Sequence, residues 1–82
     1  MNEVYYVHIL ASETNAKAHY TGITRKLNAR LSEHNRGNCP HAAKYKLWKI
    51  ETAVAFRSEE KAHRFERYLK SASGRAFAKR HF

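Results

Sequence analysis

Hydrophobic and polar residues alternate along three segments of the chain, and this pattern predicts three β-strands. The first strand runs from Val4 to Leu10 and is apolar on both faces, as expected for a central strand that is covered on both sides. A polar loop separates it from a shorter strand over His19 to Thr24, so we expect a hairpin. The third strand runs from Leu47 to Phe56, and one face is predicted to carry Trp48, Ile50, Thr52, Val54 and Phe56.

A helix is predicted after the second strand. Thr24 is expected to be its N-cap, and Asn35 lies near its end, where Gly37 can adopt a left-handed cap. Leu27 and Leu31 are four residues apart and predict its buried stripe.

Ser58 predicts the start of another helix, because its hydroxyl can accept from free backbone N–H groups. The expected core stripe of this helix has helical spacing over Ala62, Phe65 and Leu69. We predict that Gly74 interrupts the chain and that residues 75–82 form a short last helix, whose Phe77 packs back onto the domain.

The order of these elements predicts an α/β (α+β) fold, with a small three-stranded antiparallel sheet flanked by helices in the order β-β-α-β-α(-α). The 82 residues predict one domain over residues 1–82, which can bury about 60% of the surface of the unfolded chain. The single cysteine, Cys39, excludes an intrachain disulfide. His34, Cys39 and His41 fit no established zinc-ligand spacing.

The net charge of the chain indicates which class of molecule the protein binds. Sixteen Lys and Arg residues against seven Asp and Glu residues give a net charge of +9, which indicates a polyanion as partner, nucleic acid before an anionic membrane. The basic residues are spread along the chain and do not form one amphipathic helix, so a membrane is disfavoured. The sequence shows no bilayer-spanning run and no signal peptide, so we expect a soluble, cytoplasmic protein.

One strand-to-helix unit carries the most distinctive chemistry. Tyr20 and Gly22 stand on the second strand, Arg30 follows ten residues after the tyrosine, and His34 follows four later. Such a set suits a site that acts on a phosphodiester, because it combines a phenol, a tight backbone segment, a guanidinium and an imidazole.

These residues, with others along the chain, resemble the GIY-YIG nuclease superfamily, in particular its small stand-alone bacterial members, which are similar to the nuclease half of a nucleotide-excision-repair subunit. The resemblance spans nearly the whole chain and is carried by Tyr5-Tyr6-Val7-His8-Ile9-Leu10, Tyr20-Thr21-Gly22-Ile23-Thr24, Leu27-Asn28-Ala29-Arg30-Leu31, Glu33-His34-Asn35, Trp48, Ala62, Glu66, Leu69-Lys70 and Gly74-Arg75-Ala76-Phe77.

The resemblance implies a role for each matching residue. Tyr20 corresponds to the tyrosine of the YIG half, Gly22 to its glycine and Arg30 to the catalytic arginine. His34 matches a histidine that contacts phosphate or orients the site. Glu66 matches the carboxylate that holds one divalent ion, Mg²⁺ or Mn²⁺.

Each of these residues also has a purely structural interpretation. Tyr20 can fill the core beside an ordinary bulge glycine, and Arg30 can be a solvated helix residue. His34 can cap or pack, and Glu66 can pair with Lys70 at i+4.

The departure from the family pattern is His8, which stands where the family has its first tyrosine; Tyr6 lies on the same strand face, one step earlier. Either His8 takes over the polar role, or the protein binds nucleic acid without cleaving it. An imidazole has an ordinary pKa of about 6.5, so His8 could act as a general base near neutral pH. This interpretation predicts an acidic inflection near neutrality in the pH–rate profile. A structural histidine buried in a central strand is the alternative.

The resemblance therefore implies a divalent-metal-dependent endonuclease that acts on nucleic acid, DNA more than RNA. The alternatives are a nucleic-acid-binding module that has lost catalysis and a basic module that binds an acidic protein. The residues expected to bind nucleic acid are Gly22, Lys26, Asn35, Arg36, Lys44, Lys46, Lys70 and Arg75.

Overall fold

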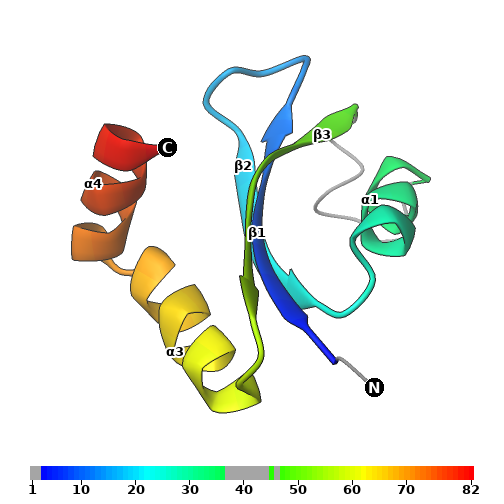
Figure 1. The fold of residues 1–82 in the computed structure, drawn as a ribbon. Helices are drawn as coiled ribbons and strands as arrows, with labels where there is room; N and C mark the ends of the chain where they lie inside the picture. Colours follow the sequence, from blue (N-terminus) through cyan, green and yellow to red (C-terminus); the bar gives the residue numbers. More distant parts are fainter. Residues whose placement is uncertain (1–2, 37–44, 46) are drawn as a thin grey trace.

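A computed structural model of the protein describes residues 3–36, 45 and 47–82. It contains a three-stranded sheet with helices on both faces (Figure 1). The elements in chain order are β1 (Tyr5–Ser12), β2 (His19–Thr24), α1 (Leu27–Asn35), β3 (Trp48–Phe56), α3 (Glu59–Leu69) and α4 (Ala72–His81). The predicted fold class and order of elements are confirmed.

β1 is the central strand, and it pairs antiparallel with β2 on one side and β3 on the other. The predicted hairpin of β1 and β2 is closed by Ser12, whose N–H donates to the Ala18 carbonyl at 3.0 Å. The Ser12 hydroxyl also accepts from the backbone N–H groups of Thr14 and Asn15, at 3.2 and 3.1 Å. These bonds explain why the polar segment after β1 turns sharply enough to return as β2.

The two faces of the sheet bury separate apolar clusters. Val7 and Ile9 pack with Ala62 and Leu69 beneath α3. Leu10 points to the opposite face, where Trp48 joins it in a second cluster beside α1. The alternation predicted for β1 is confirmed, and the helices that cover the two faces lie on opposite sides of the sheet in Figure 1.

A β-bulge reverses the faces of β3. Thr52 pairs with Ile9, but the next residue of β1, Leu10, pairs with Ile50, so β3 carries one extra residue. As a result Ile50 packs with Leu10 beside α1, whereas Phe56 packs in the cluster beneath α3. The prediction that alternate residues of β3 share one face is therefore wrong.

The connection into α1 also differs from the expectation. The N-cap position is Lys26, whose side chain makes no capping bond. The hydroxyl of Thr24, the predicted N-cap, accepts from the Lys26 N–H at 3.1 Å and so forms a turn before the helix. α1 ends at Asn35, as predicted, and Gly37 lies outside the described residues.

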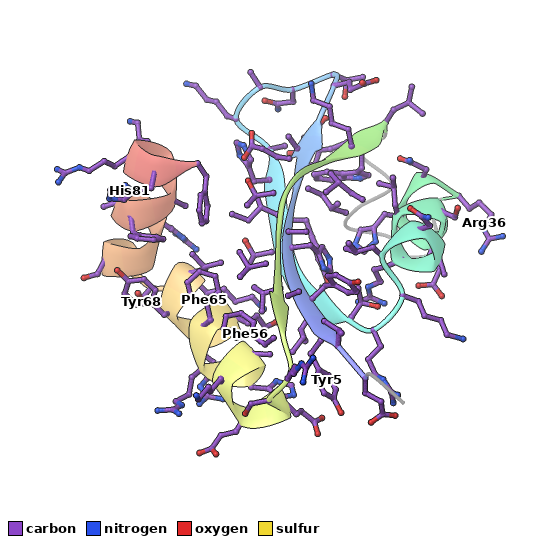
Figure 2. The ribbon with its side chains drawn as sticks, in the orientation of Figure 1. Tyr5, Arg36, Phe56, Phe65, Tyr68 and His81 are labelled. Carbon is purple, nitrogen blue, oxygen red and sulfur yellow. The ribbon has the colours of Figure 1, made fainter. Side chains whose placement is uncertain are left out.

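α3 begins as predicted, with the Ser58 hydroxyl accepting from the Lys61 N–H at 3.2 Å. The two acidic residues of its first turn, Glu59 and Glu60, lie at the positive end of the helix dipole. Phe56 of β3 points toward Phe65 of α3 (Figure 2), with ring centroids 5.5 Å apart.

α4 begins earlier than predicted and contains Gly74. The Ser71 hydroxyl caps the helix by accepting from the Gly74 N–H at 3.1 Å. A Cβ added to Gly74 would lie 1.7 Å from the Tyr68 carbonyl oxygen, so only a glycine fits where α4 leaves α3. Gly74 therefore permits a close helix–helix turn, and the prediction that it interrupts the chain is wrong. Phe77 packs back against Phe65 as predicted, with centroids 6.4 Å apart.

Candidate active site

Tyr20 of β2 is at the centre of a polar and aromatic cluster on the face of the sheet that α1 covers. Its ring meets the ring of His34 edge-on, with centroids 4.3 Å apart and planes at 63°. Its hydroxyl oxygen accepts from Nη2 of Arg30 at 3.4 Å. Arg30 and His34 are four residues apart on α1, which directs both side chains toward Tyr20.

Gly22 makes room for two of these rings. It pairs directly with His8 across the hairpin. A Cβ on Gly22 would lie 2.9 Å from Cε1 of Tyr20 and 3.2 Å from Nε2 of His8. The ring centroids of His8 and Tyr20 are 6.4 Å apart. Gly22 thus has a packing role in the cluster, because any side chain here would push the two rings apart.

Exposure divides the cluster into an inner and an outer part. His8 and His34 are completely buried, with 0% of their surface exposed. Tyr20 is half-buried, and 35% of the Arg30 side chain is exposed. A ligand can therefore reach Arg30 and Tyr20, while the two histidines support Tyr20 from within.

Burial dominates the electrostatics of His8. The pKa of His8 is lowered to about 4, mainly by desolvation; the backbone of Tyr6 opposes this change, and the charges of Arg30 and His34 contribute to it. Neither ring nitrogen has a well-aligned hydrogen-bond partner among the described residues. His8 is therefore a neutral imidazole at neutral pH, and the expectation of a titration near neutrality does not match its surroundings.

Arg30 keeps its positive charge in this setting. Partial burial alone would lower the pKa of Arg30, but the hydrogen bond and charge interaction with Tyr20 and the pairing with Glu33 raise it above its ordinary value. The Glu33 carboxylate lies 3.5 Å from Nη1. The guanidinium thus has a hydroxyl on one nitrogen and a carboxylate on the other, and both contacts hold it in place.

α1 is fixed to the sheet by its last turn. Nδ1 of His34 lies 3.0 Å from the Arg30 carbonyl oxygen, and its ring meets Trp48 edge-on with centroids 6.4 Å apart. The Asn35 amide donates to the Trp48 carbonyl at 3.1 Å and accepts from its N–H at 2.6 Å. Asn35 therefore joins α1 to the start of β3, a structural role that the sequence pattern did not indicate.

An open groove of about 640 Å³ runs beside Arg30. Its lining residues are Glu3, Val4, Thr24, Arg25, Lys26, Ala29, Arg30 and Glu33. Arg25 was not predicted as a site residue, although its place between β2 and α1, next to Lys26, could have identified it. It pairs with Glu3 and lies over the Tyr5 ring, 5.6 Å from the centroid.

Glu66 lies on α3, which covers the other face of the sheet from α1 (Figure 1). Its side chain is 16% exposed, and its Oε2 lies 3.1 Å from Nζ of Lys70. Within residues 3–36, 45 and 47–82, no hydrogen bond or ion pair joins Glu66 to Tyr20, Arg30 or His8. Its charge nevertheless raises the pKa of His8 slightly, so it acts electrostatically on the cluster.

Metal-ligand chemistry is sparse in the described part of the chain, where no group of three or more His, Cys, Asp or Glu side chains could hold an ion. Glu66 is the one residue predicted from the sequence as a metal ligand, and among the described residues no such group surrounds it. A single half-buried carboxylate suits Mg²⁺, which keeps several waters and takes its other ligands from substrate oxygens.

The other predicted site residues are dispersed. Tyr6 is half-buried on the same strand face as His8 and pairs with Thr24 and Ala55. Figure 2 shows Arg36 at the outer end of α1, and Lys26 is the N-cap residue of the same helix. Lys70 and Arg75 belong to the opposite face, with α3 and α4. Lys44, Lys46, Cys39 and His41 lie outside the described residues.

No helix in the described ranges is long and apolar enough to cross a membrane.

No curated protein and no solved structure matches the chain significantly. The family model of the GIY-YIG catalytic domain matches residues 4–80. This range includes the whole sheet, the tyrosine–arginine–histidine cluster beneath α1, all of α3 and all but the last residue of α4. The chain therefore belongs to the GIY-YIG family of nuclease domains.

Proposed function

We propose that the protein is a divalent-metal-dependent endonuclease that hydrolyses phosphodiester bonds in nucleic acid, and in DNA in preference to RNA. The observation that carries the proposal is the contact between Arg30 and the Tyr20 hydroxyl, beside the groove that Arg30 lines together with Arg25 and Lys26. Both residues are partly accessible, and the resemblance to the GIY-YIG family implies a functional role for both.

Arg30 is the phosphate-binding group in this proposal. Its guanidinium presents planar donors that match a phosphate, and its charge stabilises the negative charge that develops at phosphorus during hydrolysis. Burial of one side of Arg30 against Tyr20 strengthens this effect, because charges interact more strongly away from bulk water.

Tyr20 positions the attacking water. Since its oxygen accepts from Arg30, this contact leaves its own O–H free to donate to a water or to a phosphate oxygen. His8 and His34 are wholly buried and hold the Tyr20 ring in place, so they are positioning residues. Tyr6, half-buried on the same strand face as His8, is a second phenol on this face of the sheet and a further candidate for orienting the water.

Glu66 holds the divalent ion, Mg²⁺ or Mn²⁺, in this proposal. A bound divalent ion supplies Lewis-acid stabilisation of the leaving oxygen. Lys70 would have to release Oε2 of Glu66, and this is feasible because the Lys70 side chain is 53% exposed and can be solvated instead.

The proposed DNA contacts outside the cluster are to phosphates. Lys26 and Arg36 lie on the α1 side of the sheet with Arg30, and both are exposed. Arg25 extends this basic edge along the groove. Contacts of this kind position the nucleic acid and carry no base information.

A second function is favoured by one observation. His8 stands at the position of the first tyrosine of the family, and its burial at 0% exposure removes it from contact with any substrate. A protein without that tyrosine could retain binding and lose hydrolysis. The alternative is a nucleic-acid-binding module with the same fold.

Incubation of the protein with supercoiled plasmid and labelled single strands, in Mg²⁺, Mn²⁺ or EDTA, separates the two functions. We expect cleavage that needs a divalent ion and is lost in Arg30→Ala and Glu66→Gln. Glu60→Gln is the matched control, since Glu60 is an exposed glutamate at the other end of α3. Binding without cleavage in either metal ion would establish the binding module, and activity retained in Arg30→Ala would reject the assigned site.

A further inference from the structure

The surface formed by the end of α3 and by α4 carries basic and aromatic side chains that the proposed cleavage site does not use, apart from the Glu66–Lys70 pair. Residues 64–82 contain six Lys and Arg residues and one acidic residue, Glu66, which pairs with Lys70. All six basic residues are exposed: Arg64, Arg67, Lys70, Arg75, Lys79 and Arg80. This surface lies on the opposite face of the sheet from α1 (Figure 1), so the sheet separates its exposed basic side chains from Tyr20 and Arg30.

Aromatic rings are exposed on the same two helices. Tyr68 is 41% exposed and Phe82 is 44% exposed. Phe77 lies between them, with its ring centroid 5.9 Å from that of Tyr68 and 5.5 Å from that of Phe82. The three rings form a continuous strip from α3 to the end of α4, and His81 lies against Phe77 at 4.8 Å. Figure 2 shows Tyr68 and His81 on this side of the molecule.

Helical spacing places basic residues next to aromatic residues on both α3 and α4. Arg75, Lys79 and Phe82 follow one another at intervals of four and three residues, so they share a face of α4 and its last turn. Arg64 and Tyr68 are four residues apart and share a face of α3. Cations and exposed aromatic rings therefore alternate across both helices, in what we term the α3–α4 surface (Arg64, Tyr68, Arg75, Lys79 and Phe82).

We propose that the α3–α4 surface binds single-stranded nucleic acid, separately from the cleavage site. Phosphates contact Arg64, Arg75 and Lys79, and unstacked bases lie on Tyr68 and Phe82. Rings interleaved with cations are the arrangement that single strands require, because every base offers a face for stacking. A duplex keeps its bases stacked inside and could use the charges alone. A second copy of this chain would bring like charges together, which opposes self-association.

The test uses the full chain in EDTA, so that its outcome does not depend on cleavage. Anisotropy of a labelled single-stranded oligonucleotide is measured against salt for Arg75→Gln/Lys79→Gln and for the control Lys49→Gln/Arg57→Gln, which removes two exposed charges at the two ends of β3. Each phosphate contact to a single strand contributes about 0.7 to the slope of log affinity against log salt, so the first variant should lose roughly 1.4 relative to the control. Equal slopes in the two variants overturn the proposal.

A second variant tests stacking directly. Phe82→Trp introduces an indole at the exposed end of the ring strip, whereas the natural Trp48 is only 5% exposed. We expect its fluorescence to be quenched by the single strand and much less by a duplex of the same sequence. Equal quenching by both, no quenching by the single strand, or stronger quenching by anionic lipid vesicles overturns the assignment to single strands.

Discussion

At the scale of single residues, His8 shows how burial changes the chemistry that a side chain can perform. An imidazole in water titrates near neutral pH, but the sheet removes His8 from solvent and lowers its pKa to about 4. The same burial that keeps His8 neutral also keeps it from the substrate. His8, for which the sequence pattern allowed a catalytic role, thus lies inside the fold beside Tyr20.

The depressed pKa of His8 predicts how stability depends on pH. Between about pH 6.5 and pH 4 the unfolded chain binds a proton at His8 that the folded chain does not, so the free energy of unfolding falls as the pH falls. The stabilisation of the folded state that comes from His8 is fully present above about pH 6.5. Lowering the pH through this window removes about 3 kcal/mol from the free energy of unfolding. Urea unfolding of the protein and of His8→Phe at several pH values in this window should show a smaller pH dependence in the variant. His81→Gln, which changes an exposed histidine, should match the unmodified protein.

Gly22 carries the second prediction at this scale. In Gly22→Ala the new methyl group would meet Tyr20 at 2.9 Å and His8 at 3.2 Å, so the rings must move. We expect a loss of about 1–3 kcal/mol in unfolding free energy, as for overpacked cores, together with loss of cleavage. His8→Ala should partly relieve the strain, so in a double-mutant cycle Gly22→Ala should cost less when His8 is already alanine. Strict additivity would show that the two positions do not share the space.

These residues mark how much of the site the sequence could predict. The spacing of Tyr20, Arg30 and His34 was sufficient to predict that they meet, because a strand and the next helix have few ways to pack. The sequence left two interpretations of His8 open, a general base and a buried structural histidine, and its burial is decided by α1, which covers this face of the sheet. The two hydrogen bonds between Asn35 and the Trp48 backbone depend likewise on how α1 packs against β3. The sequence between these two residues has no regular hydrophobic pattern that would predict this packing.

At the scale of elements, the order and bounds of strands and helices follow closely from the sequence, and the errors arise at contacts between elements. The alternation along β3 continues without a break through the bulge, so nothing local shows that the strand changes face. The bulge follows from pairing with β1, where Thr52 and Ile50 take successive partners. Gly74 is similar, because a glycine in a helical segment reads as a breaker until the neighbouring helix is known.

Gly74 gives the prediction at this scale. Gly74→Ala would place a methyl group 1.7 Å from the Tyr68 carbonyl oxygen, and backbone cannot move away as a side chain can. We expect α4 to separate from α3, at a cost of at least about 3 kcal/mol, visible as a lower thermal midpoint and as fast amide exchange in α4. Ser73→Ala, an exposed neighbour in the same turn, is the control and should be nearly neutral. Normal exchange in α4 of the Gly74 variant would show that the turn can open without loss of packing.

At the scale of the whole molecule, the central sheet separates two basic regions. One borders the Tyr20–Arg30 cluster beside α1, and the other lies on α3 and α4 (Figure 1). Both draw on the same net charge of +9, and the pair of Tyr20 and Arg30 borders only the first. The distribution follows from the fold, since the charges are dispersed along the sequence and the two helical layers divide them between the faces.

This division of the basic residues between two faces predicts that salt lowers the affinity for the substrate far more than the rate of the cleavage step. If four phosphates are contacted on a duplex, affinity should fall roughly a hundredfold between about 50 and 200 mM salt, because each contact releases a counterion. The single-turnover cleavage rate at saturating protein should change little over the same range, because Arg30 and Tyr20 are partly shielded from solvent. Measuring both quantities on one labelled duplex separates the two effects. Affinity that is insensitive to salt would contradict phosphate-based capture, and a cleavage rate that falls in parallel with affinity would place the salt-sensitive contacts in the transition state itself.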